Sequence, residues 1–148
     1  MRRLTMGGGL YAALAVASAV GATGCGSSPI TAARIEAAIE RTFANLVHVQ
    51  VSWLGLQPMA ASEFPVTASC RKLTAGTSEG AGDWVCTLAW QGPDRQAVRD
   101  TFDLFVTTDG CYMATAAGDN LGGPILKALN GTEVRNLLYA FEGCFDTT

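Results

Sequence analysis

Apolar residues recur at helical spacing in the stretch that follows residue 30. Four of them stand at i, i+4, i+8 and i+11 and so share one face of a helix: Ile35, Ile39, Phe43 and Leu46. The charged residues of this stretch lie mostly off that face, and Thr31 is placed to cap the first turn. The pattern predicts a helix over 32–46 whose apolar face packs on a sheet.

The spacing then changes from helical to strictly alternating. The apolar residues alternate with His48, Gln50 and Ser52, and they are Val47, Val49, Val51 and Trp53. Alternation with period two is typical of a strand with one buried face, because successive side chains point to opposite sides. We therefore predict a half-buried strand over 47–53.

Turn signals divide most of the remaining chain into short apolar segments. Residues rich in Gly, Asp, Ser and Pro form the predicted turns at 77–82, 91–94 and 108–110. Strands are predicted between and beside them, over 66–70, 84–90, 102–106 and 111–114. The whole pattern predicts an α+β fold: an N-terminal helix packed on an antiparallel β-sheet meander, in a single disulfide-stapled domain.

The tail of the chain leaves two structures open. Residues 118–124 form a glycine-rich loop. The dipeptide Asn130-Gly131 either turns a hairpin between 125–129 and 132–139 or precedes a short helix over 133–139.

The first residues carry the pattern of an export signal. Arg2 and Arg3 precede an apolar stretch that runs from Leu10 to Val20. That stretch is shorter than the roughly 20 residues that a membrane-spanning helix needs. A basic start, a short apolar core and small residues predict a signal peptide over 1–24 rather than a permanent span.

The small residues that end this segment are Ala22-Thr23-Gly24-Cys25, and they resemble the lipobox of bacterial lipoproteins. The resemblance implies cleavage before Cys25 and attachment of lipid, with acyl chains such as palmitate, to its sulfur. Ala22 stands where the family usually has a larger aliphatic residue. Residues 25–30 then form a tether and residues 31–148 an extracytoplasmic domain, lipid-anchored on the outer face of the cell membrane.

Cysteine parity agrees with this interpretation. Of five cysteines, removing Cys25 leaves four, which an oxidising compartment favours as disulfides: Cys70, Cys86, Cys111 and Cys144. Four cysteines allow three pairings. The predicted strands favour Cys70 with Cys86 across a hairpin, and Cys111 with Cys144 between the last hairpin and the C-terminus. Such loops contribute roughly 3 to 4 kcal/mol each in the chain-entropy model.

Charge and histidine content limit the chemistry of the domain. Without the two signal arginines, eight basic residues face thirteen acidic ones, a net charge of −5, and basic residues do not cluster beyond Arg71-Lys72. Nucleic acid is therefore not an expected partner. His48 is the only histidine and is predicted to lie on the surface, so we expect no metal site and no cofactor.

Catalytic residues are not evident either. Paired thiols exclude a cysteine nucleophile, and a Ser–His–Asp triad would have to use His48, the only histidine. Carboxylates remain as candidates for acid/base chemistry on envelope glycans, although turn or surface roles are commoner: Asp100, Asp103, Asp109, Asp119, Glu142 and Asp146.

The aromatic residues are the remaining candidates for binding. Trp84 and Trp90 share a strand face with Cys86, which predicts that they are core residues. A second set is a candidate to line a groove, with core packing as the commoner alternative: Trp53, Tyr112, Tyr139, Phe141 and Phe145.

The second half of the chain resembles small lipoproteins of high-GC Gram-positive bacteria that have no assigned activity. The resemblance covers about residues 66–148 and depends on cysteine–aromatic spacing, as in Asp83-Trp84-Val85-Cys86, Asp109-Gly110-Cys111-Tyr112 and the segment 141–146. It implies an exported domain with two disulfides. We expect a non-enzymatic binding module for an envelope protein, a polymer or a small apolar ligand. A carboxylate-dependent glycan hydrolase and, by fold analogy alone, a cystatin-like inhibitor are the alternatives.

Overall fold

The computed structural model describes residues 29–92 and 96–147. The predicted signal peptide over 1–24, the lipidation site Cys25 and most of the tether lie outside the described residues. Within the described ranges, no helix is both long and apolar enough to cross a membrane.

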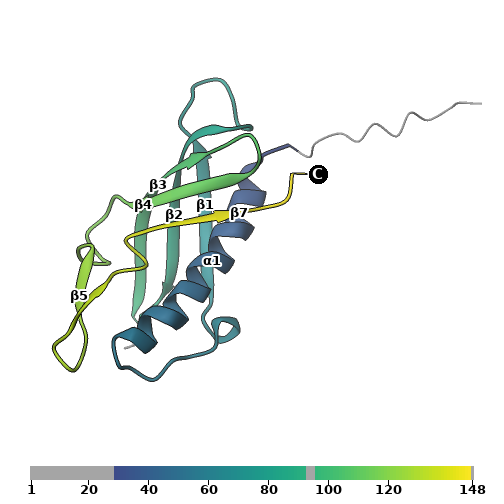
Figure 1. The fold of residues 1–148 in the computed structure, drawn as a ribbon. Helices are drawn as coiled ribbons and strands as arrows, with labels where there is room; N and C mark the ends of the chain where they lie inside the picture. The colour runs from purple at the N-terminus through teal and green to yellow at the C-terminus, as the bar shows by residue number, and fades with distance from the viewer. Residues whose placement is uncertain (1–28, 93–95, 148) are drawn as a thin grey trace, which may run out of the picture.

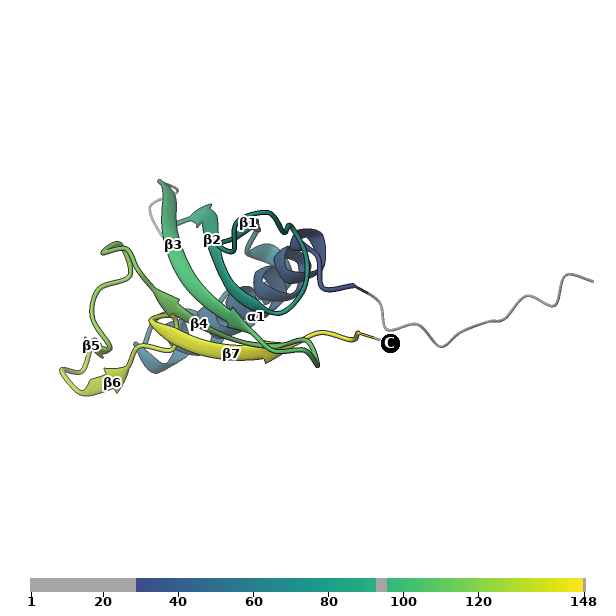
Figure 2. The ribbon, with the colours of Figure 1, turned by 90° about the horizontal axis from the view of Figure 1, so that it is seen from above.

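One long helix, α1 (Ala32–Trp53), packs across one face of a five-stranded antiparallel sheet (Figures 1 and 2). The strand order is β1-β2-β3-β4-β7. The bounds are β1 (Val66–Lys72), β2 (Gly82–Gln91), β3 (Ala97–Val106), β4 (Cys111–Ala116) and β7 (Ala140–Cys144). The predicted α+β fold is therefore confirmed. The simple meander is wrong in part, because the chain leaves the sheet after β4 and returns as β7.

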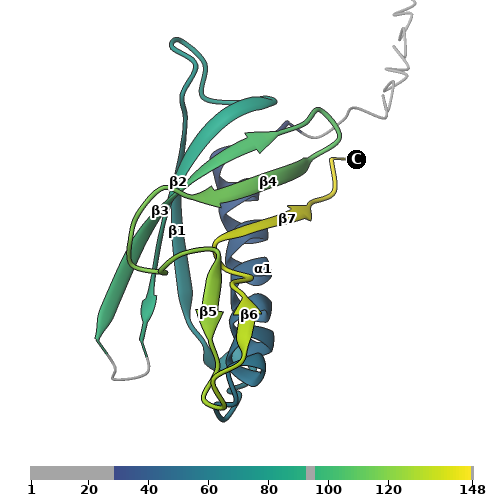
Figure 3. The same ribbon diagram turned by 60° about the vertical axis from the view of Figure 1, so that its left-hand side comes forward.

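Between β4 and β7 the chain forms a separate two-stranded hairpin, β5 (Ile125–Lys127) and β6 (Glu133–Arg135). Gly131 turns this hairpin with φ of 83°, a conformation that glycine adopts without strain. Of the two structures left open for the tail, the hairpin is correct and the helix is wrong. In Figure 3 the hairpin lies apart from the sheet, beside the C-terminal half of α1.

The strand predicted over 47–53 is wrong, because α1 continues to Trp53. Gln50 shows the reason. Strand alternation places its side chain on the polar face, whereas on the helix it is 2% exposed and points inward with Phe43 and Val47. Packing of the long helix overrides the strand preference of the β-branched valines.

The start of α1 is partly as predicted. Thr31 is the N-cap residue, but its side chain makes no capping hydrogen bond, and it forms an isolated β-bridge with Glu79 instead. Ile30, which we counted with the tether, is buried, and its carbonyl accepts a hydrogen bond from the Gly80 N–H at 2.8 Å. Packing of the described domain therefore includes Ile30.

The core lies between the apolar face of α1 and the inward residues of β2, β3 and β4. Phe43 is at its centre, with ring centroids 5.0 Å from Trp90, 5.8 Å from Phe102 and 6.1 Å from Phe141. Tilted and edge-on contacts of this kind are favourable for aromatic rings. The inward face of β2 and three residues of the helix stripe, Ile35, Ile39 and Phe43, are where the sequence predicts them. The fourth residue of the stripe, Leu46, is half-buried and lies outside the core cluster.

Both predicted disulfides are present. Cys70–Cys86 joins directly opposed residues of β1 and β2, and Cys111–Cys144 joins directly opposed residues of β4 and β7. The first disulfide faces the helix, because Cys86 shares the buried face of β2 with Trp84. The second faces away from the helix, because Cys111 precedes the buried Tyr112 and successive side chains of a strand point to opposite faces. The sheet is therefore crosslinked at both of its edge strands.

Carboxylates of α1 accept hydrogen bonds from backbone N–H groups along the edge strand β1. Glu40 accepts the N–H of Ala68 and Glu36 accepts the N–H of Cys70, both at 2.8 Å. An unpaired strand edge invites pairing with another chain, so these two bonds protect β1.

Candidate functional site

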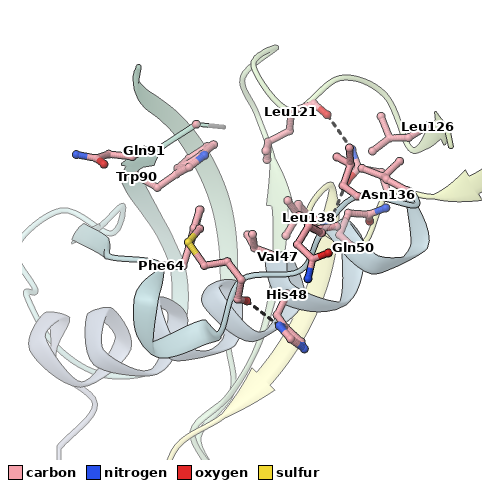
Figure 4. A pocket seen from close by; sticks show the side chains of 16 residues that line it. Val47, His48, Gln50, Phe64, Trp90, Gln91, Leu121, Leu126, Asn136 and Leu138 are labelled. Atoms are coloured by element: carbon pink, nitrogen blue, oxygen red, sulfur yellow. Dashed lines mark hydrogen bonds between the residues drawn. The ribbon is translucent and has the colours of Figure 1, made fainter. Parts of the chain in front are cut away.

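A cavity of about 500 Å³ lies at the C-terminal end of α1. It is lined by the last turns of the helix, the loop that follows, the end of β2, the hairpin and the segment that leads into β7. Figure 4 shows these side chains converging from several parts of the chain. A volume of this size is typical of sites that bind small molecules.

The short strands at one side of the sheet create this space. β4 ends at Ala116 and β7 begins at Ala140, so residues 117–139 cover the end of α1 in place of sheet strands. Loop and hairpin side chains such as Leu121 and Leu126 then line the cavity together with Val47 and Trp90. The cavity is thus a consequence of where the chain leaves the sheet.

Asn136 joins the two chain segments that form one wall. It is 2% exposed, and its Nδ2 donates to the carbonyls of Leu121 and Gly123, both at 2.9 Å. Its Oδ1 accepts the N–H of Leu138 at 3.1 Å (Figure 4 draws part of this network). These bonds satisfy the donors and one acceptor position of the side chain, so Asn136 has a structural role.

Gln50 contributes a second buried amide to the wall, from α1. Its Oε1 accepts the N–H of Leu137 at 2.6 Å, which fixes which end of the amide is oxygen, because an N–H donor requires an acceptor. Its Nε2 is buried and has no hydrogen-bond partner among the described residues. Buried donors without partners are rare in folded proteins.

His48 lies at the exposed side of the cavity, where its Nδ1 is 2.7 Å from the carbonyl of Met59 (Figure 4). A carbonyl only accepts, so Nδ1 is the donor in this hydrogen bond. The bond attaches the loop after α1 to the helix. The prediction that His48 is a surface residue is confirmed, although it lies on a helix and not on a strand.

The lining is apolar and, apart from His48, its polar side chains are neutral amides. These are Gln50, Gln57, Gln91 and Asn136. None of the described lining residues is Asp, Glu, Lys or Arg. The cavity offers contact area and hydrogen bonds but no fixed charge from the described part of the chain.

The candidate carboxylates of the sheet are divided between its two faces. Asp100 points inward and is 3% exposed, whereas Asp103, three residues along β3, and Glu142 on β7 point outward. Asp100 packs against Gly118, where an added Cβ would lie 1.7 Å from Oδ1. It accepts the N–H of Thr101, and its Oδ2 has no partner in the described ranges. Asp100 does not line the cavity.

The other three acids are exposed. Asp109 lies in the β3–β4 turn, where the Thr107 hydroxyl donates to its carboxylate and lowers its pKa below the usual value. This is the bond pattern of a turn residue. Asp119 and Asp146 lie on loops at the surface. No group of three or more His, Cys, Asp or Glu suited to a metal ion occurs among the residues that the structure describes.

The five aromatic residues proposed for a groove do not line the cavity. Tyr112 is buried, its hydroxyl donates to Thr42 Oγ1 at 2.9 Å, and burial raises its pKa. Trp53 is exposed, and Phe141 belongs to the core. The aromatic lining comes from Phe64 and from Trp90, which the sequence places in the core and which both packs on Phe43 and faces the cavity.

A second hollow of about 410 Å³ lies on the opposite face of the sheet. It is bordered by Phe105 and Met113, which are 52% and 63% exposed, and by the acids Asp83 and Asp103. Its acidic border distinguishes it from the neutral cavity beside α1.

Comparisons with known proteins do not assign the site. No protein-family model matches the chain. Searches of curated proteins and of solved structures likewise return no match.

Proposed function

We propose that this protein is a lipid-anchored extracytoplasmic binding module that accommodates a small apolar ligand in the cavity beside the end of α1. The observation that carries the proposal is the cavity itself: about 500 Å³, with apolar walls that include Val47, Val51 and Trp90. Replacement of water by an apolar ligand in such a space is favourable, because it removes apolar surface of both the ligand and the walls from water. None of the described residues that line the cavity is an acid, so the cavity does not support the alternative of a glycan hydrolase.

The anchor is supported by the lipobox-like sequence and by the pairing of the other cysteines. Four of the five form the two disulfides, which leaves Cys25 for lipid. Mass spectrometry of the membrane fraction tests this part. We expect a mature N-terminus at Cys25 that carries acyl mass, and a mature N-terminus elsewhere would contradict it.

Two adjacent residues of β5 provide a matched test of the cavity. Leu126 lines the cavity, while Ile125 points outward and is 54% exposed. The background is the full-length Cys25→Ser chain, so that no acyl chain at this position competes for the site. Binding of N-phenyl-1-naphthylamine, a neutral dye that fluoresces in apolar surroundings, is the measurement.

We expect saturable binding that Leu126→Lys weakens at least tenfold, because an ammonium group enters the apolar lining. Ile125→Lys, the same change on the solvent side, leaves the affinity within twofold. Equal effects of both variants, or no saturable binding at all, would contradict the proposed function.

A further inference from the structure

We infer that the ligand of the cavity is an uncharged amphiphile, an apolar body with a hydrogen-bond-accepting group such as an ester, amide or ketone, and not a fatty carboxylate or an amine. The inference rests on the proposed function and specifies its ligand. Two independent observations carry it: the neutrality of the lining, and the donor that Gln50 leaves unused.

Neutrality argues against ionised ligands. The described lining holds amides and one imidazole, and none of it is an acid, a lysine or an arginine. An ion that leaves water for apolar walls loses its hydration, and a site recovers that loss only with an opposite charge or several aligned donors. His48 already uses its Nδ1 on Met59, so it offers a ligand only its Nε2.

The two buried amides of the wall differ in what they leave available. Asn136 uses both Nδ2 and Oδ1 on backbone groups. Gln50 uses only Oε1, on Leu137, so both hydrogens of its Nε2 are without a partner in the described part of the chain. Because Nε2 has almost no exposed surface, a ligand oxygen reaches it when the amide shifts toward the cavity. An accepting oxygen then satisfies the donor, and a pure hydrocarbon does not.

Size agrees with a short amphiphile. The cavity volume of about 500 Å³ falls within the range of sites that enclose drug-sized molecules. Exposed amide side chains at Gln57 and Gln91 border the cavity, so a polar end group that reaches solvent also finds neutral hydrogen-bonding partners there.

Three probes with the same chain length separate the possibilities: methyl decanoate, decanoate and decane. Each displaces N-phenyl-1-naphthylamine from the full-length Cys25→Ser protein at pH 8, where decanoate is ionised. We expect methyl decanoate to bind about fivefold more tightly than decane, the value of one ordinary hydrogen bond, and at least tenfold more tightly than decanoate.

Variants of Gln50 test its part in this preference. Gln50→Glu keeps an oxygen for the Leu137 N–H but removes the donor, and Gln50→Met removes both. In either folded variant we expect methyl decanoate to lose its advantage over decane, while decane still binds to Gln50→Met within twofold of the parent. Circular dichroism shows whether each variant is folded. If Gln50→Met is unfolded, the comparison of methyl decanoate with decane is made on Gln50→Glu.

Asp94 and Arg95 follow Gly92 in the sequence and lie outside the described residues, so they need a control. The double change Asp94→Asn with Arg95→Gln should preserve the order of the three affinities. Decanoate binding as tightly as its ester, or an ester no better than decane, would overturn this inference while the proposed function survives. Failure of all three probes to bind would overturn the proposed function itself.

Discussion

The two halves of α1 are covered in different ways. Toward its N-terminus the helix packs on continuous strands, and Ile35, Ile39 and Phe43 are completely buried. Toward its C-terminus it is covered by loops and a hairpin, which meet it through Gln50 and through the bond from the Leu129 N–H to the Leu54 carbonyl at 3.0 Å. Strands give close packing, and loops leave a cavity, so one helix serves stability at one end and binding at the other.

The difference predicts where truncation of a side chain destabilises the protein. Phe43→Ala removes the ring that contacts Trp90, Phe102 and Phe141, and should lower the free energy of unfolding by about 3–5 kcal/mol. Val51→Ala, on the cavity wall, should cost below about 1.5 kcal/mol because the wall is not closely packed. Urea unfolding of both variants is the measurement, and equal losses would remove the distinction between the two halves.

Both disulfides join strands of the five-stranded sheet, so we expect them to contribute to the stability of the fold and not to binding in the cavity. Removing the bond in Cys70→Ala/Cys86→Ala, where the sequence separation is 16, should cost about 3 kcal/mol. We expect thermal unfolding to shift downward while dye binding in the cavity stays within twofold at a temperature where the variant is folded. A selective loss of binding in the folded variant would show that the crosslink supports the cavity directly.

Asn136 gives the corresponding test for the loop-covered half. Asn136→Ala leaves the carbonyls of Leu121 and Gly123 and the N–H of Leu138 without their partner, at a cost of about 2 kcal/mol. Hydrogen exchange should accelerate in residues 121–138 and remain slow in β2 and β3. Asn130→Ala in the exposed hairpin turn is the matched control: it removes only the bond from the Thr132 N–H and should accelerate exchange at that amide alone. Uniform acceleration throughout the sheet would contradict a separate role for Asn136.

A smaller effect is expected where one hydrogen bond joins helix and sheet within the close-packed part. Tyr112→Phe removes the donor to Thr42 Oγ1 and should cost about 1 kcal/mol in urea unfolding. Thr42→Val removes the acceptor, and the double variant should cost less than the sum of the two single changes. Additive losses would show that the pair does not interact.

The sequence predicts the close-packed half better than the cavity half. The apolar spacing of Ile35, Ile39 and Phe43, the alternation in β2 and the cysteine positions are local patterns, and the structure confirms the helix face, the strand and both disulfides. The cavity instead depends on side chains that are distant in sequence, such as Trp90 and Leu126, and on where β4 ends. Such contacts leave no periodic signal along the chain.

Gln50 illustrates the limit in one residue. Alternating valines around it predict a strand with Gln50 on the solvent side, and that assignment hides a buried amide. Its position seven residues after Phe43 is the available signal, because i and i+7 share a helix face. The choice between the two periods is made by tertiary packing, which short-range patterns do not contain.

Chemical-shift mapping tests the central claim most directly. The full-length Cys25→Ser protein, labelled with ¹⁵N, is titrated with N-phenyl-1-naphthylamine, and the amide signals that move are assigned. Binding in the cavity predicts saturable shifts in residues 47–59, 90–92 and 121–138. Shifts centred on Phe105 and Met113 on the opposite face of the sheet, or no saturable shifts, would contradict the account.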